Sequence, residues 1–131
     1  MKYIAMTIIM VLLVGCQSAS NESQDEESGA VYRKISPEEA KKMMEEEGVL
    51  IVDVREQNEY DEGHIKNATL IPVGTIQAGS LAMLPDKDQK LLIYCRSGNR
   101  SGTAAKALVS YGYTQVYDFG GVNTWPYELV Q

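Results

Sequence analysis

One short segment of this sequence combines residue types that could do covalent chemistry. It lies between an apolar run and a stretch whose apolar residues have helical spacing, and it is Cys95-Arg96-Ser97-Gly98-Asn99-Arg100. Gly98 permits backbone angles that turn successive amide groups inward around an anion. The positive end of the following helix would point at the same place. Because these groups and the two arginines favour a thiolate, we predict that Cys95 is a nucleophile with a lowered pKa.

Few other residues could support metal or redox chemistry. The chain has two cysteines and one histidine, so it cannot assemble a zinc site from four cysteines or from two cysteines and two histidines. A scaffold with several disulfides is excluded as well. His64 lies far from Cys95 in sequence, and Gly63-His64-Ile65 is more typical of a structural turn than of half of a Cys–His pair. The chemistry must therefore come from the Cys95 segment.

The charge balance is acidic overall and basic near Cys95. There are 12 Lys and Arg against 18 Asp and Glu, for a net charge of −6. Binding to nucleic acid without sequence preference needs a basic surface, so we expect no nucleic-acid partner. Two of the four arginines, Arg96 and Arg100, follow Cys95 directly. The sequence thus predicts a local site for a small anion on an acidic protein.

Strands and helices alternate over the last hundred residues. Ser36-Pro37-Glu38-Glu39 is a capping box with proline at the first helical position, and it begins a helix that we expect to end at Gly48. Apolar runs predict strands at 49–54, 69–71, 90–94 and 115–117. Helical spacing predicts further helices at 58–62, 75–83 and 101–110, and a terminal helical segment containing Trp125.

This alternation predicts an α/β fold with a small open parallel sheet and helices on both faces. In such sheets, ligand sites lie beyond the carboxyl ends of the strands. Cys95 directly follows the predicted strand at 90–94, so it would lie at this edge. The length of 131 residues fits a single domain.

The first 16 residues have the order of a secretory signal. Lys2 is followed by an apolar run from Tyr3 to Val14 and then by Gly15-Cys16, and the run is shorter than the roughly 20 residues of a spanning helix. Leu13-Val14-Gly15-Cys16 resembles the lipobox of bacterial lipoproteins, which implies that residues 1–15 are a signal peptide and that Cys16 is lipidated. The alternatives are an uncleaved membrane anchor or an ordinary secretory signal with a chance cysteine.

The segment 17–30 contains no large apolar side chain, so it cannot bury enough surface to offset the entropy of ordering. We predict that residues 16–30 form a lipid-bearing, flexible acidic tether and that residues 31–131 form the folded domain. The domain would then be held at the bacterial cell envelope on the non-cytoplasmic side. It contains one thiol, Cys95.

Four motifs in this order resemble a single-domain rhodanese, over about residues 34 to 131. They are Val52-Asp53-Val54-Arg55-Glu56, Glu59-Tyr60-x-x-Gly63-His64-Ile65, Tyr94-Cys95-Arg96-Ser97-Gly98-Asn99-Arg100-Ser101 and Gly120-Gly121-x-x-x-Trp125. The resemblance implies a thiosulfate sulfurtransferase-like enzyme in which Cys95 carries sulfur as a persulfide. By position, the backbone of 96–100 would hold the persulfide, and Arg100 and Arg96 would receive the anionic donor. Arg55 matches an Asp-x-Arg segment, where an ion pair with Asp53 is as plausible as a substrate contact.

The expected partners are a small anionic sulfur donor and an external thiol or cyanide acceptor, because the domain has no second thiol to discharge a persulfide. A sulfur-acceptor protein is a further candidate partner. Covalent sulfur on Cys95 would divide the transfer into two displacements, and the amides would stabilise the persulfide between them. No metal and no organic cofactor is needed.

Three alternatives remain open. A cysteine phosphatase or arsenate reductase has a Cys-x5-Arg loop, whereas Cys95 to Arg100 is the shorter Cys-x4-Arg, and Tyr94 replaces the histidine that precedes the phosphatase cysteine. A low-turnover carrier or binding module for sulfane sulfur would need the same loop as the enzyme. A purely structural or docking lipoprotein is disfavoured by the presence of Cys95.

Overall fold

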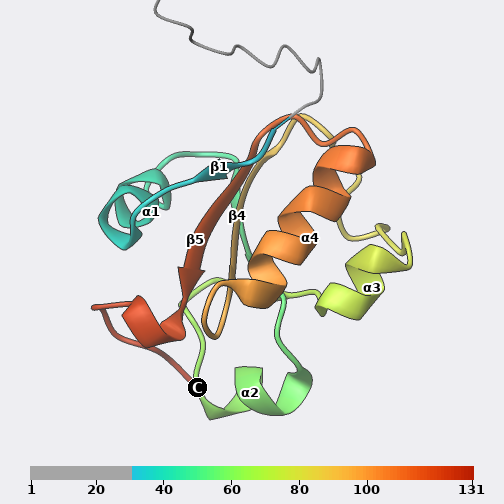
Figure 1. Cartoon of the computed structure of the whole chain (residues 1–131). Coiled ribbons are helices and arrows are strands. Elements are labelled where there is room, and N and C mark those ends of the chain that lie inside the picture. Colours follow the sequence, from blue (N-terminus) through green and yellow to red (C-terminus); the bar gives the residue numbers. More distant parts are fainter. Residues whose placement is uncertain (1–30) are drawn as a thin grey trace, which may run out of the picture.

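The computed structural model describes residues 31–131, and the predicted signal peptide, Cys16 and the tether lie outside these residues. Its centre is a sheet of five parallel strands in the order β1-β5-β4-β2-β3 (Figure 1). The strands are β1 (Arg33–Lys34), β2 (Val49–Asp53), β3 (Thr69–Leu70), β4 (Lys90–Cys95) and β5 (Val116–Gly121). The predicted open parallel sheet is therefore confirmed.

Helices cover both faces of the sheet, as predicted. They are α1 (Pro37–Met43), α2 (Gln57–Glu62), α3 (Val73–Gln77) and α4 (Asn99–Ser110), with a 3-10 helix η1 (Val122–Thr124). In Figure 1, α3 and α4 lie on one side of the sheet and α1 on the other, while α2 lies below the carboxyl ends of the strands. Among residues 31–131, no helix is long and apolar enough to cross a membrane.

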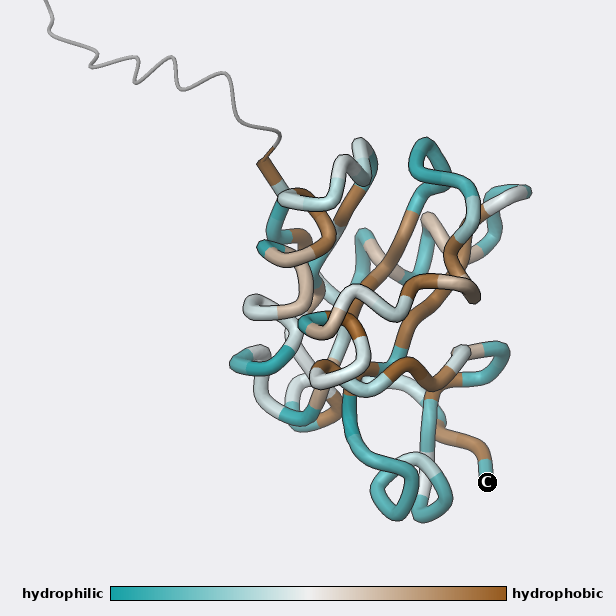
Figure 2. Tube along the Cα trace, turned by 90° about the vertical axis from the view of Figure 1, so that its right-hand side faces the viewer, coloured by the Kyte–Doolittle hydropathy of each residue, from teal (hydrophilic) through white to brown (hydrophobic). Residues whose placement is uncertain are grey.

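Alternate residues of the central strands enter two separate cores, because successive side chains of a strand point to opposite faces. Leu91, Ile93 and Cys95 of β4 pack toward α3 and α4. Leu92 and Tyr94 pack on the other face, with residues of α1 and with Trp125. Figure 2 shows the hydrophobic residues gathered along the central strands and the hydrophilic residues in the surrounding turns. The two faces together hold β4 rigidly up to its last residue, Cys95.

Helix α1 begins as predicted but ends earlier. The Ser36 hydroxyl accepts a hydrogen bond from the amide of Glu39, whose carboxylate accepts one from the amide of Ser36. The helix ends at Met43 instead of Gly48. The residues in between are Met44 and three glutamates, and negative charge at a helix C-terminus is unfavourable. Gly48 still closes the turn, with a φ of 75°.

Other boundaries also differ from the predicted ones. The predicted helix 75–83 is the shorter α3, and Gly79 follows it with a φ of 74°, a left-handed angle that ends a helix. Strand β5 continues to Gly121 because it stays paired with β4. Strand β1 was not predicted, since its two residues are exposed and not apolar. Trp125 directly follows η1.

Candidate functional site

The segment after Cys95 folds back over the sulfur atom. Cys95 is the last residue of β4, and α4 begins four residues later at Asn99. Gly98 adopts a left-handed φ of 101°, which an L side chain rarely adopts. This angle lets the amide of Gly98 donate a hydrogen bond to Sγ of Cys95 at 3.0 Å. Cys95 is 1% exposed, so its sulfur lies at the base of the loop.

Ser101 is a site residue that we did not predict as such. Its side chain is buried, its hydroxyl lies 3.5 Å from Sγ of Cys95, and it donates to the carbonyl oxygen of Gly120 at 3.3 Å. It lies six residues after Cys95, on the first turn of α4. The only signal in the sequence was its place at the end of the cysteine motif. The hydroxyl can donate to Sγ once the thiol loses its proton.

The pKa of the Cys95 thiol is lowered by hydrogen bonds. Burial raises this pKa, but the Ser101 hydroxyl and the amides of Ser101, Gly98 and Ser97 lower it by more, so that the net change is downward. The direction agrees with the prediction from the sequence. The amides contribute as predicted, but the largest single lowering comes from the hydroxyl of Ser101, which the sequence did not indicate, and the arginines are not among the causes.

Strand β5 and the residues after it pack closely against the start of the loop. The pairing of β4 with β5 shifts register between Ile93 and Cys95, which places Cys95 opposite Gly121. A Cβ atom on Gly121 would lie 2.7 Å from the carbonyl oxygen of Cys95 and nearer still to the carbonyl group of Arg96. The amide of Asn123 donates to the carbonyl oxygen of Arg96 at 3.1 Å. Only a glycine lets β5 approach the start of the loop so closely.

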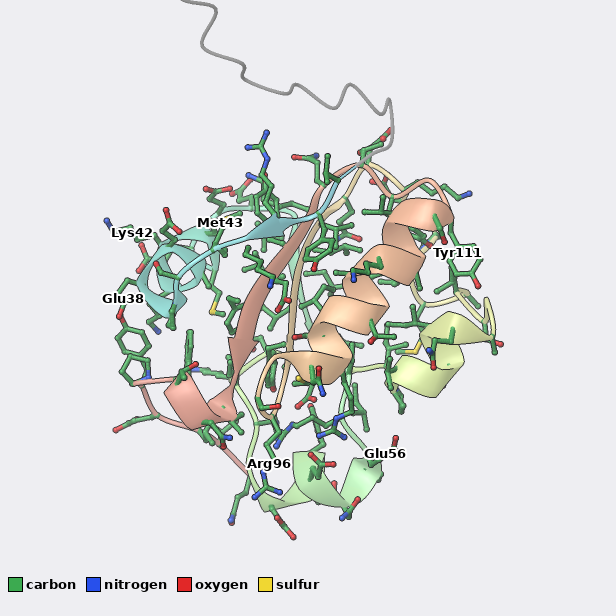
Figure 3. The ribbon with its side chains drawn as sticks, viewed as in Figure 1. Glu38, Lys42, Met43, Glu56, Arg96 and Tyr111 are labelled. Carbon is green, nitrogen blue, oxygen red and sulfur yellow. The ribbon has the colours of Figure 1, made fainter. Side chains whose placement is uncertain are left out.

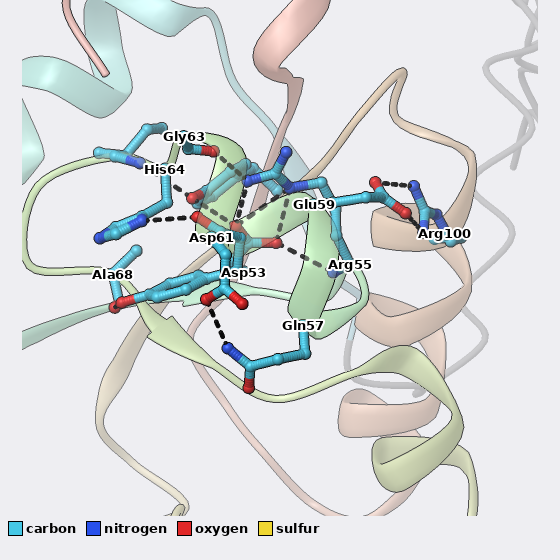
Figure 4. A network of polar contacts seen from close by, with 12 residues as sticks. Asp53, Arg55, Gln57, Glu59, Asp61, Gly63, His64, Ala68 and Arg100 are labelled. Carbon is cyan, nitrogen blue, oxygen red and sulfur yellow. Dashed lines mark hydrogen bonds and ion pairs between the residues drawn. The ribbon is translucent and has the colours of Figure 1, made fainter. Parts of the chain in front are cut away.

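The two arginines of the loop have different surroundings. Both terminal nitrogens of Arg100 donate to the two carboxylate oxygens of Glu59, each at 2.8 Å (Figure 4). Glu59 belongs to α2, so this ion pair joins α2 to α4. The Arg100 side chain is 32% exposed and that of Glu59 20%. Arg96 is exposed (Figure 3) and lines a cavity of about 210 Å³ together with Arg55, Glu59 and Asn123.

Arg55 takes part in a buried ion pair. Its Nε and Nη2 donate to the carboxylate of Asp53, and Nη2 also donates to the carbonyl oxygen of Gly63 at 2.7 Å. The hydroxyl of Tyr94 donates to the same carboxylate at 2.7 Å. Arg55 is 5% exposed and Asp53 fully buried. Of the two roles weighed for Arg55, the structure shows the ion pair, which ties β2, β4 and the turn at Gly63 together.

The side chains of the remaining predicted residues make no hydrogen bond to Sγ of Cys95 in the described structure. Ser97 and Asn99 are exposed, and with Gly98 they line a second cavity of about 410 Å³. The His64 ring stacks on Tyr60, with ring centroids 3.7 Å apart, so it has the structural role expected for it. Cys95 is a free thiol. Within residues 31–131, no group of three or more His, Cys, Asp or Glu side chains could hold a metal ion.

A family model and curated proteins match most of this chain. The model of the rhodanese-like domain family matches residues 36–127. Thiosulfate sulfurtransferase GlpE of Coxiella burnetii is 36% identical over 96 residues, which cover 72% of this chain and 88% of that protein.

Solved structures show the same fold. A rhodanese-like domain protein from Staphylococcus aureus is 34% identical, with a TM-score of 0.63, over 71% of this chain and 90% of that one. A rhodanese with anions from E. coli is 30% identical, with a TM-score of 0.58, over 63% of this chain and 98% of that one.

Proposed function

The chain belongs to the rhodanese-like domain family and is a thiosulfate sulfurtransferase-like enzyme, and we propose that it carries sulfane sulfur as a persulfide on Cys95. The observation that carries this proposal is the position of Sγ, which lies at the carboxyl end of β4 with the amide of Gly98 at 3.0 Å and the hydroxyl of Ser101 at 3.5 Å. Such a site stabilises a negative sulfur, first as thiolate and then as persulfide.

The first half of the cycle loads the protein. The Cys95 thiolate attacks the outer sulfur of thiosulfate, and a bond forms between the two sulfur atoms. The bond from the outer sulfur to the sulfonate group breaks, and its electron pair leaves with sulfite. The product is a negatively charged persulfide on Cys95, which the inward amides and the Ser101 hydroxyl stabilise.

The second half discharges the protein. A nucleophilic acceptor, such as cyanide or an external thiolate, attacks the outer sulfur of the persulfide. The sulfur–sulfur bond breaks and its electron pair returns to Cys95 as the thiolate. Cyanide becomes thiocyanate in this step, and no oxidant or reductant is consumed. Cys95 is the only thiol among residues 31–131, so the acceptor comes from outside the domain.

Intact-mass measurement tests this assignment. Incubation with thiosulfate should add one sulfur atom to the protein, and cyanide should then remove it. The Cys95→Ser variant should gain no sulfur, because it lacks the nucleophile. An equal mass gain in Cys95→Ser would contradict the assignment of Cys95.

The same assay separates an enzyme from the alternative, a low-turnover carrier that delivers sulfane sulfur to a partner protein. Thiocyanate that accumulates steadily in excess over the protein indicates an enzyme. A single loading followed by slow discharge to cyanide indicates a carrier, whose acceptor would be a protein thiol. The enzyme and the carrier both require the Cys95 persulfide, and they differ in the acceptor.

We also propose that this domain is anchored at the non-cytoplasmic side of a bacterial membrane through lipidated Cys16. Support comes from the order Lys2, an apolar run and Leu13-Val14-Gly15-Cys16, and stable anchoring needs more than one acyl chain. Mass analysis of the protein extracted from membranes should find acyl groups on Cys16 and a chain that begins there. A soluble protein that keeps residues 1–15 would contradict this proposal.

A further inference from the structure

Arg100, the residue expected to receive an anionic donor, already binds an anion within the protein. The carboxylate of Glu59 accepts from both terminal nitrogens of Arg100 at 2.8 Å. This is the bidentate geometry in which a guanidinium group binds carboxylates and other oxyanions. Glu59 lies 41 residues away in sequence, so the contact depends on how α2 is placed below the sheet.

Both side chains of this ion pair are charged and partly exposed to solvent. The hydrogen bond from Arg100 lowers the pKa of Glu59 and outweighs the effect of burial, so Glu59 is ionised at neutral pH. The side chains are 20% and 32% exposed, so a small anion in solution can reach them. The pKa of Arg100 is raised by Glu59 and, to a smaller extent, by the charge of Cys95. Arg100 directly precedes Ser101, whose hydroxyl lies 3.5 Å from Sγ of Cys95, on the first turn of α4, so the ion pair lies beside the cysteine loop.

We propose that Glu59 is a specificity-determining residue that competes with oxyanion donors for Arg100. This inference rests on the proposed function. A donor such as thiosulfate must displace the carboxylate or share the guanidinium with it, and the negative charge of Glu59 also repels a dianion. A donor without an oxyanion group does not meet this competition. Glu59 thus weakens the binding of thiosulfate-like donors relative to uncharged ones.

The Glu59→Gln variant measures the competition, and Asp61→Asn is its matched control, because Asp61 is exposed and does not line the cavity beside Arg96. Both residues belong to α2 and both changes remove one negative charge, but only Glu59 pairs with Arg100 in the described structure. An ion pair of this exposure opposes a competing ligand by about two- to fivefold. We expect Glu59→Gln to lower KM for thiosulfate by this factor with kcat unchanged, and Asp61→Asn to leave KM within twofold of the wild-type value.

A second measurement does not depend on sulfur transfer. Iodoacetamide is uncharged and alkylates the Cys95 thiolate. Sulfate is an inert dianion that should slow this alkylation by binding at Arg100 beside the cysteine. At constant ionic strength, the sulfate concentration that halves the rate at the Cys95 peptide should fall two- to fivefold in Glu59→Gln. Because each variant is compared with its own rate without sulfate, a change in thiol reactivity does not affect the result.

The two assays distinguish the possible failures. If thiosulfate does not load Cys95, the proposed function is wrong, while sulfate protection still decides the role of Glu59. If the protection midpoint in Glu59→Gln rises or stays equal to that of Asp61→Asn, the competition is absent and the inference is overturned. A higher KM for thiosulfate in Glu59→Gln would also overturn it, since Glu59 would then be holding Arg100 in place for the donor.

Discussion

Replacing Gly121 by alanine should disable the loop without changing any group that takes part in the reaction. Gly121 has extended backbone angles, with φ −166° and ψ −179°, so alanine causes no backbone strain there. The added Cβ would instead meet the carbonyl groups of Cys95 and Arg96, with the Cys95 oxygen at 2.7 Å, whereas real Cβ contacts are essentially never below 3.0 Å. Either β5 or the start of the loop must move.

The size of the effect follows from this displacement. A misplacement of roughly 1 Å in a reacting group costs on the order of 100-fold in rate, and overpacking of this kind costs about 1 to 3 kcal/mol of stability. We therefore expect the rate of sulfur loading from thiosulfate, measured by intact mass, to fall about 100-fold. The free energy of unfolding in urea should fall by the smaller, overpacking amount, so that the protein stays folded.

Gly74→Ala is the matched control for this prediction. Gly74 lies in α3, and a Cβ there has no atom within 4 Å. Alanine is the better helix former, so this variant should gain about 0.5 to 1 kcal/mol in the free energy of unfolding and keep the wild-type loading rate. If Gly121→Ala loads sulfur within twofold of the wild-type rate, the close approach of β5 is not what positions Cys95.

Two further predictions concern the thiol and the buried ion pair. Ser101→Ala removes a hydrogen bond that lowers the pKa of Cys95; alkylation by iodoacetamide, which rises with pH as the thiolate forms, should therefore need a higher pH, and an unshifted pH profile would assign the lowering to the amides alone. Asp53→Asn leaves the buried Arg55 without its counter-charge and should lower the free energy of unfolding by about 3 to 5 kcal/mol. Lys90→Gln, which breaks an exposed ion pair, should change it far less.

The elements that depend on neighbouring residues could be predicted from the sequence. The capping box at Ser36, the buried strand before Cys95 and the helix after it depend on neighbouring residues, and they are found where we predicted them. The end of β5 was misjudged, because Gly120-Gly121 is typical of a turn. In the structure Gly121 is a strand residue, and its lack of a side chain is needed for contact with β4, which sequence spacing does not reveal.

The parts of the site that depend on distant contacts could not be predicted. The sequence indicated that Arg100 was available for a donor, but Glu59 reaches it from another helix. The hydroxyl of Ser101 gained its role from burial against Cys95 and Gly120. Arg55 had two plausible roles, and its distances to Asp53 were needed to show the ion pair.

The parallel sheet also determines where this protein can be modified for laboratory use. All five strands run in the same direction. Residue 31 therefore joins the fold near the amino ends of the strands, opposite the carboxyl ends where Cys95 lies (Figure 1). The last residue is at the other end, where the Gln131 side chain donates to the carbonyl oxygen of Glu62 and Leu129 lines the cavity beside Arg96. Purification tags and surface immobilisation therefore belong at the amino-terminal side of a form that begins after Cys16, whereas a fusion after Gln131 would lie beside the cavity that Arg96 lines.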